Sequence, residues 1–293
     1  MNILQTEKNV LILTHNYEGG SKIFLNRYIE KNFKNCGIFI LKSDSNSNDP
    51  MTTPENFLWI NYRSPLQSYI IKADIQILSQ EVQRAHITEV FINHLINFNL
   101  PSMTNWLLAS KLPFTYMIHD YHCVCMNYRL DCGVQFCESS VVKPVCRYYL
   151  KNILIWEWRK FWGNFLNAAK EIIAPSNYTA SIIKKAYPNL SITIQPHILN
   201  ASLSQTFRTE FAMRKKLRIT FLGLMVEHKG EEYLLKLNEF IQQENLPIEV
   251  VVIGRYFDEV RAGTKEGIIF VGEYAVNEVS QKLAQFETVL LPY

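Results

Sequence analysis

Residues 10–33 read VLILTHNYEGGSKIFLNRYIEKNF. Val10–Thr14 is an apolar run of strand length, Gly19-Gly20 supplies a turn, and Ser21–Phe33 has the residue spacing of a helix. A strand that is apolar on both faces belongs to a sheet that helices cover on both sides. This stretch therefore predicts the first strand–turn–helix unit of a parallel α/β sheet.

The same alternation continues on both sides of a polar stretch. Before it, strands are expected at Gly37–Leu41, Phe57–Asn61, Glu89–Asn93, Phe114–Ile118, Glu171–Ala174 and Ser191–Gln195, and helices at Gln67–Gln83, Thr104–Lys111, Arg147–Ala169 and Asn177–Ala186. After it, strands are expected at Arg218–Leu222, Ile248–Ile253, Gly267–Val271 and Thr288–Leu291, and helices at Gly230–Glu244 and Asn277–Phe286.

The 293 residues are enough for two domains. We expect an N-terminal domain at 1–200 with a Cys-rich insertion at 121–147, a linker at 201–213 and a C-terminal domain at 214–293. A doubly wound half usually has about six strands, whereas the second series supplies four. We therefore expect the second domain to be incomplete and the chain to be truncated at its C-terminus.

The composition narrows the class of protein. With 48% hydrophobic and 19% charged residues the chain is typical of globular proteins. Its net charge is only +3, without a concentrated basic patch, so nucleic acid is not an expected partner. The start, MNILQTEKNVLILTH, lacks the form of a signal peptide, and no apolar run is long enough to cross a bilayer. We therefore predict a cytoplasmic protein.

Two candidate segments lie in the first half, where open α/β sheets bind ligands at the carboxyl ends of their strands. In the loop from His15 to Gly20, the glycines let a ligand approach the backbone, although an ordinary turn would also explain them. His119 can donate to an oxygen that gains charge, and Asp120 can fix its tautomer or cap the next segment. The alternative is a structural histidine beside a turn-forming aspartate.

A third segment, GLMVEHKG at Gly223–Gly230, repeats the arrangement of strand, glycine, loop and helix. Lys229 would add a positive charge to the anion site that a helix N-terminus offers. A diphosphate is the natural ligand for such a site. The alternative is a solvated lysine in a surface loop.

The ordered set of motifs resembles a known family. The Gly-Gly loop, IHDY (118–121), IIAPSNYTAS (172–181), FLGLMVEHKG (221–230), VVVIGR (250–255), VGEY (271–274) and VLLPY (289–293) make nearly the whole chain similar to glycosyltransferase family 4, of the GT-B fold, and to its bacterial polysaccharide and O-antigen subgroup. The resemblance implies two Rossmann-like doubly wound parallel-sheet domains. It also implies retaining transfer of a sugar from a nucleotide sugar to a saccharide or lipid-linked acceptor, with no metal or other cofactor.

The resemblance also implies roles for single residues. His119, with Asp120, would be catalytic and contact the donor sugar, while Lys229 would hold the donor diphosphate. The other implied donor-binding positions are Gly223, Glu227, Gly230 and Gly254, and those of the cleft or acceptor side are His15, Gly19, Gly20, Ser176 and His197.

Two departures from the family pattern limit this interpretation. Leu224 stands where many members have an arginine, and the Pro-Glu loop and Glu-x7-Glu motif that follow VLLPY in the family are missing. The alternative is therefore a truncated, non-catalytic remnant that binds a nucleotide or a partner subunit.

Two further features leave alternatives open. Zinc sites usually use C-x₂₋₄-C pairs; the irregular spacing here argues against a metal, whose candidate ligands would be Cys123, Cys125, Cys132, Cys137 and Cys146. The aromatic and basic helix at Arg147–Ala169 is expected to be a buried packing helix. Its alternative role is peripheral contact with the inner face of a membrane, which a lipid-linked acceptor would favour.

Overall fold

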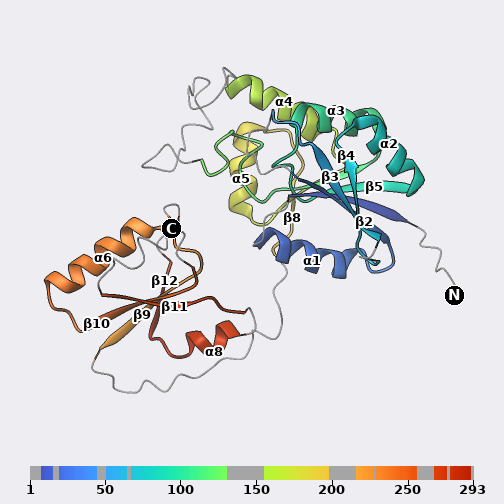
Figure 1. Cartoon of the computed structure of the whole chain (residues 1–293). Coiled ribbons are helices and arrows are strands. Elements are labelled where there is room, and N and C mark those ends of the chain that lie inside the picture. The colour runs from blue at the N-terminus through green and yellow to red at the C-terminus, as the bar shows by residue number, and fades with distance from the viewer. Residues whose placement is uncertain are drawn as a thin grey trace. The chain divides into compact units, whose positions relative to one another are not determined.

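The computed structural model describes residues 8–15, 20–44, 51–64, 67–130, 155–197, 216–226, 229–255, 267–275 and 278–291. The chain divides into two compact units, unit 1 (Met1–Ile198) and unit 2 (Leu199–Tyr293). Figure 1 shows the elements of each. The expected linker at 201–213, and residues 131–147 of the expected Cys-rich insertion, lie outside the described residues.

Unit 1 is built on an eight-stranded sheet of order β4-β3-β2-β1-β5-β6-β7-β8. Its strands are β1 (Asn9–Thr14), β2 (Gly37–Ser43), β3 (Asn56–Asn61), β4 (Tyr69–Lys72), β5 (Ile87–Ile92), β6 (Phe114–Met117), β7 (Glu171–Ala174) and β8 (Thr193–Ile194). Strand β1 pairs in parallel with β2 on one side and with β5 on the other. The strand order therefore reverses at β1, which makes the carboxyl end of β1 the topological switch point where such sheets bind ligands.

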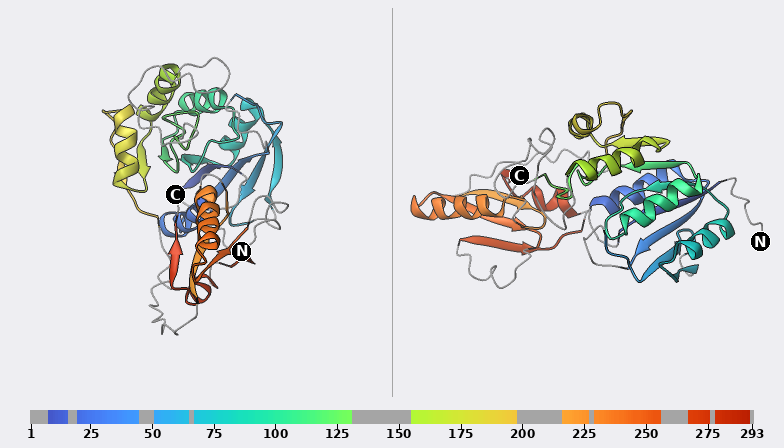
Figure 2. Two further views of the ribbon diagram at one scale, coloured as in Figure 1. Left: turned by 90° about the vertical axis from the view of Figure 1, so that its left-hand side faces the viewer. Right: turned by 90° about the horizontal axis from the view of Figure 1, so that it is seen from above.

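Helices cover both faces of this sheet, as the apolar strands predict. They are α1 (Gly20–Asn32), α2 (Ile75–Arg84), α3 (Leu100–Ser110), α4 (Ile155–Asn167) and α5 (Asn177–Ala186). Side chains of β1 alternate between the two faces: Val10 and Ile12 pack with α1, and Leu11 and Leu13 pack in the core shared with the other four helices. Figures 1 and 2 show α1 on one side of the sheet and α3 and α4 on the other.

One predicted helix is wrong in its first part. Tyr69–Lys72, expected to be helical, forms β4, which pairs antiparallel with β3, itself antiparallel to β2. The sheet is therefore not parallel throughout. Ile71 is buried and Ile70 is 69% exposed, which is the alternation of an edge strand. Helix α2 starts only at Ile75, where Oδ1 of Asp74 accepts the backbone N–H groups of two first-turn residues, at 2.6 and 3.3 Å.

Unit 2 has a four-stranded parallel sheet of order β11-β10-β9-β12. Its elements are β9 (Leu217–Leu222), α6 (Glu231–Gln243), β10 (Ile248–Ile253), β11 (Ile268–Gly272), α8 (Val279–Leu283) and β12 (Thr288–Leu290). Leu234 and Ile241 of α6 pack against Phe221 of β9 and against Val250 and Val252 of β10. Helix α8 is shorter than the expected helix at 277–286 and buries no residue.

Replacing Asp74 should destabilise unit 1 through the start of α2. In Asp74→Ala two first-turn N–H groups lose their acceptor, so the free energy of unfolding should fall by about 1 kcal/mol. Asp74→Asn keeps an acceptor oxygen and should lose less. All five tryptophans lie in unit 1, so urea unfolding followed by tryptophan fluorescence reports on this unit. Equal stability of Asp74→Ala and the unchanged chain would show that α2 does not depend on this cap.

Candidate active site

Polar residues gather at the carboxyl ends of three neighbouring strands of unit 1. Thr14 ends β1, Asn93 follows β5 and His119 follows β6. Because β1, β5 and β6 run parallel, these ends meet at one edge of the sheet. Four imidazole rings lie here in a chain of contacts, and we call them the histidine cluster. Its ring centroids are 5.1 Å apart for His15 and His94, 6.3 Å for His94 and His119, and 5.9 Å for His119 and His197.

His119 is oriented by a residue that the motifs did not single out. Its Nε2 lies 2.8 Å from Oδ1 of Asn93, whose side chain is fully buried. Nδ2 of Asn93 in turn donates to Oγ1 of Thr14 at 3.0 Å. A carbonyl oxygen can only accept a hydrogen bond, so Nε2 of His119 carries the proton. The signal in the sequence was the position of Asn93 at the end of an apolar strand.

Asp120 was expected either to fix the tautomer of His119 or to cap the next segment, and its contacts match the second role. Its Oδ2 lies 2.9 Å from Nε2 of His94, and its Oδ1 accepts the backbone N–H of His122 at 2.9 Å. Nδ1 of His94 accepts the backbone N–H of Ile96 at 3.0 Å. Both ring nitrogens of His94 are therefore in use. The pair of His94 and Asp120 holds the loops after β5 and β6 together, and His94 has no nitrogen left for a ligand.

Burial sets the charge of these groups. It lowers the pKa of His119 to about 3 and that of His15 to about 4, with the neighbouring His94 adding to the effect in both. Burial alone would raise the pKa of Asp120, but the facing His94 and the hydrogen bonds to the carboxylate lower it to about 2. At neutral pH the rings of His15 and His119 are therefore uncharged, and the Asp120 carboxylate is charged.

Some of the other positions predicted for the cleft lie near His119, and others do not. Gly19 lies outside the described residues, while Gly20 begins α1 and has open space around its Cα. Nε2 of His15 lies 3.1 Å from the Ser21 hydroxyl. His197 is exposed and belongs to the histidine cluster. Oγ of Ser176 accepts the N–H of Thr179 at 3.1 Å, so this side chain caps α5.

In unit 2 the corresponding sheet edge is made of glycine. Gly223 follows β9, Gly254 follows β10 and Gly272 ends β11, and we call these three residues the glycine edge. Their φ angles of +122°, +141° and +86° lie in the region that favours glycine. The N–H of Gly223 donates to Ile253 O at 2.9 Å, and that of Gly254 to Gly272 O at 2.8 Å. Gly272 was not among the predicted donor-binding residues.

The glycine edge is both crowded and open. A Cβ on Gly254 would lie 2.0 Å from the carbonyl oxygen of Gly223, so the two backbones approach too closely for any side chain. A Cβ on Gly223 or Gly272 would meet nothing within 4 Å. Backbone packing therefore requires glycine at one position, and the other two leave the ends of the strands accessible to a ligand.

The structure describes the predicted diphosphate loop at residues 223–226 and 229–230. Glu227 lies outside the described residues; Lys229 is half-buried, and Gly230, with φ of +81°, precedes α6. The first turn of α6 carries Glu231 and Glu232, whose charges oppose an anion at this terminus. A phosphate here would consequently depend on the charge of Lys229 more than on the helix dipole.

The cysteines named as candidate metal ligands are buried where the structure describes them. Cys123 and Cys125 are buried free thiols, and burial raises the pKa of Cys123, while Cys132, Cys137 and Cys146 lie outside the described residues. Within the described ranges, no three His, Cys, Asp or Glu side chains are arranged to hold a metal ion.

Helix α4, from the aromatic and basic segment, packs into the core. Trp158 and Trp162 are buried, and Trp156 is 50% exposed. Nε1 of Trp158 donates to the carbonyl oxygen of His122 at 2.8 Å, which ties α4 to the segment after the histidine cluster. No helix in the part of the chain that the structure describes is both long and apolar enough to cross a membrane.

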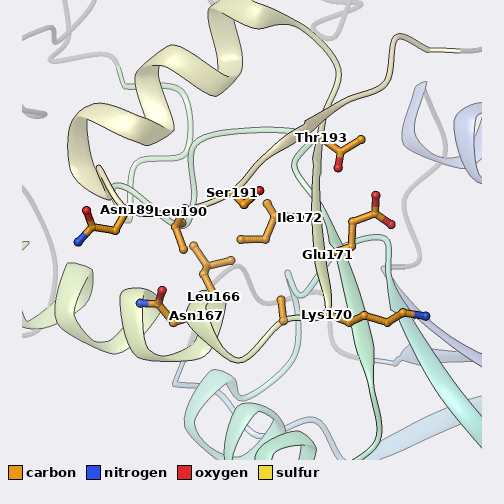
Figure 3. A pocket seen from close by; sticks show the side chains of 10 residues that line it. Leu166, Asn167, Lys170, Glu171, Ile172, Asn189, Leu190, Ser191 and Thr193 are labelled. Atoms are coloured by element: carbon orange, nitrogen blue, oxygen red, sulfur yellow. The ribbon is translucent and has the colours of Figure 1, made fainter.

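Hollows elsewhere on unit 1 do not involve these residues. The one in Figure 3 has a volume of about 200 Å³ and lies at the amino ends of β7 and β8, where Glu171 and Thr193 begin the strands. Another, of about 540 Å³, lies between α2 and α3. Neither is lined by a predicted site residue.

Comparison with known proteins shows the fold. No family model matches the chain, and no curated protein matches its sequence. Among solved structures, TarM superposes with a TM-score of 0.55 at 8% identity, over 98% of this chain and 80% of TarM. A glycosyltransferase from Rickettsia africae gives 0.53 at 10% identity, over 96% and 72% of the two chains. An alpha-glucosyltransferase in complex with UDP and DNA gives 0.51 at 9% identity, over 96% and 71%.

At such identities the likeness concerns the fold. The predicted fold class, α/β of the GT-B type with Rossmann-like domains, is confirmed. The narrower resemblance to glycosyltransferase family 4 and its O-antigen subgroup stays a prediction.

Substitution at the glycine edge should separate crowding from backbone strain. Gly254→Ala should destabilise unit 2 strongly, because the new methyl group would collide with the backbone of Gly223. Gly272→Ala is the matched control, since it has a positive φ but open space, and it should cost only about 1–2 kcal/mol. Amide hydrogen exchange of β9 and β10 measures the difference. Equal losses in both variants would contradict the close approach of Gly223 and Gly254.

The buried histidines should make unit 1 sensitive to acid. In the unfolded chain these rings bind a proton near pH 6.5, but in the folded chain His15 does so at about 4 and His119 at about 3. The contribution of each ring is thus fully present above pH 6.5 and should fall as the pH drops, down to about 4 for His15 and about 3 for His119, by at most about 1.4 kcal/mol per pH unit for each ring. Urea unfolding at several pH values should show a shallower slope for His119→Asn. An unchanged slope would show that His119 is not buried as described.

Proposed function

We propose that the chain is a glycosyltransferase that moves a sugar, with retention of configuration, from a nucleoside-diphosphate sugar to a saccharide or lipid-linked acceptor in cell-surface polysaccharide synthesis. The observation that carries the proposal is the glycine edge, with Lys229 in the segment that leads from Gly223 to α6, on a fold shared with glycosyltransferases. The solved alpha-glucosyltransferase was in complex with UDP, which makes a nucleoside diphosphate the first ligand to consider here.

Unit 2 would bind the donor through its diphosphate. The strand ends at Gly223 and Gly272 carry no side chain that would keep a ligand from the backbone. Lys229 stands one residue before the N-cap of α6 and brings a flexible positive charge. In the described part of the chain, its ammonium group has no carboxylate partner within 4 Å. A diphosphate leaving group would give the Lys229 ammonium group a negatively charged partner.

Unit 1 would bind sugar hydroxyl groups. A neutral imidazole can exchange hydrogen bonds with a hydroxyl group without attracting a free anion. His119 is the member of the histidine cluster proposed to contact the transferred sugar. Its ring lies between those of His94 and His197, and His15 lies beyond His94. Catalysis would rest mainly on stabilising the leaving diphosphate and on orienting donor and acceptor.

The role of Lys229 can be tested by comparing nucleoside diphosphates with the matching nucleosides. Lys229→Ala should weaken binding of the diphosphate about tenfold or more, because a hydrogen bond to a charged group is lost, and should leave nucleoside binding unchanged. Lys236→Ala is the matched control: this lysine is on α6 and pairs with Glu232 at 2.6 Å. Isothermal titration calorimetry measures the affinities.

The outcomes separate the proposal from its alternative. A chain that binds no nucleoside diphosphate contradicts the proposal. Binding without transfer to any saccharide or lipid-linked acceptor would instead favour the non-catalytic, nucleotide-binding alternative.

A further inference from the structure

We propose that Asn93 is a positioning residue that makes His119 a hydrogen-bond acceptor for a hydroxyl group of the bound sugar. The inference rests on the proposed function, because the sugar is its ligand. It assigns Asn93 a role that no motif in the sequence indicates, and it reverses the direction of the hydrogen bond that the sequence suggested for His119.

One ring nitrogen of His119 is occupied by a hydrogen bond to Asn93. Oδ1 of the fully buried Asn93 accepts a hydrogen bond from Nε2–H of His119, at a distance of 2.8 Å between the two heavy atoms. With the Asn93 amide in this orientation, its Nδ2 donates to the Thr14 hydroxyl oxygen at 3.0 Å. In the neutral ring the second nitrogen, Nδ1, then carries a lone pair and no proton.

The lone pair on Nδ1 of His119 is unused: among the residues that the structure describes, no donor contacts this atom. The ring is held in place by Phe24, edge-on at 5.0 Å, and by His94, parallel to it within 4°. His119 therefore presents an oriented acceptor at the switch point of the sheet. A sugar hydroxyl group is a donor that would complete it.

The surroundings of His119 keep its ring neutral. Four groups face it: His15 after β1, His94 after β5, Asp120 after β6 and His197 after β8. Burial comes first among the causes that lower the pKa of His119, and the nearby histidines add to it, although Asp120 acts in the opposite sense. Asp120 is bonded to His94 and not to His119. The amide of Asn93, which has no charge, does not stabilise an imidazolium as a carboxylate would.

The sharpest test replaces the amide of Asn93 by a carboxylate of the same shape. Asn93→Asp keeps an oxygen opposite Nε2 but adds a negative charge, so the His119 imidazolium should be stabilised and its protonation midpoint should rise by at least one pH unit. Protonated His119 carries a proton on Nδ1 and can no longer accept. As the pH is lowered, the rate of sugar transfer should therefore begin to fall at a higher pH in Asn93→Asp than in the unchanged chain.

Nitrogen-15 spectra of the imidazole rings measure the tautomer and the midpoint directly. The unchanged chain should show His119 with the proton on Nε2 throughout the neutral range. Asn93→Ala should show a mixture of tautomers. Asn61→Asp is the matched control, because Asn61 is partly exposed at the end of β3, and its Oδ1 can still accept the N–H of Arg63. It should change neither the midpoint nor the pH profile of transfer.

Two results would overturn the inference. They are a proton on Nδ1 of His119 in the unchanged chain, which needs no variant to be observed, and an unaltered midpoint in Asn93→Asp. If nucleotide sugars bind and are used but either result is found, this inference fails alone. If the tautomer is as stated but neither nucleotide sugars nor saccharides bind, the proposed function fails, and the sugar ligand with it.

Discussion

The parallel pairing of β1 with both β2 and β5 is the constraint on which unit 1 depends. Because the strands run in the same direction, the residues that follow β1, β5 and β6 arrive at one edge. Asn93 thereby meets Thr14, 79 positions earlier in the chain, and His119, 26 positions later. The apolar β1 strand, buried on both faces, fixes this arrangement through the cores on its two sides. The chemistry of the edge is therefore a consequence of how the core packs.

Unit 2 uses the same geometry for a different purpose. Its parallel strands also end at one edge, but here the chain places Gly223, Gly254 and Gly272 instead of polar side chains. One edge offers neutral hydrogen-bonding rings beside a carboxylate, and the other offers bare backbone beside a lysine. The first suits hydroxyl groups and the second suits phosphate. A nucleoside-diphosphate sugar has both kinds of group, which is the chemical basis of the proposed function.

Much of this could be predicted from the sequence, because apolar runs give strands directly. Glu171–Ala174 and Ile248–Ile253 were predicted at the bounds that β7 and β10 have in the structure. The strand at Tyr69–Lys72 was missed, because four residues are too few to separate alternation from helical spacing. For the site, the position of His119 after a buried strand was informative. Its hydrogen-bond partner was not predictable from the sequence. That Asn93 and not Asp120 bonds to His119 follows from the pairing of β5 with β6 and from the contact of Asp120 with His94.

The central claim is that the glycine edge of unit 2 binds the diphosphate of a nucleotide sugar. The chain has only 11 glycines, so selective nitrogen-15 labelling of glycine gives a spectrum in which each amide can be followed. On addition of a nucleoside diphosphate, the amides of Gly223, Gly254 and Gly272 should shift together and saturably, and the matching nucleoside alone should leave them in place. Saturable binding that shifts none of these three amides, or only glycines of unit 1, would contradict the account.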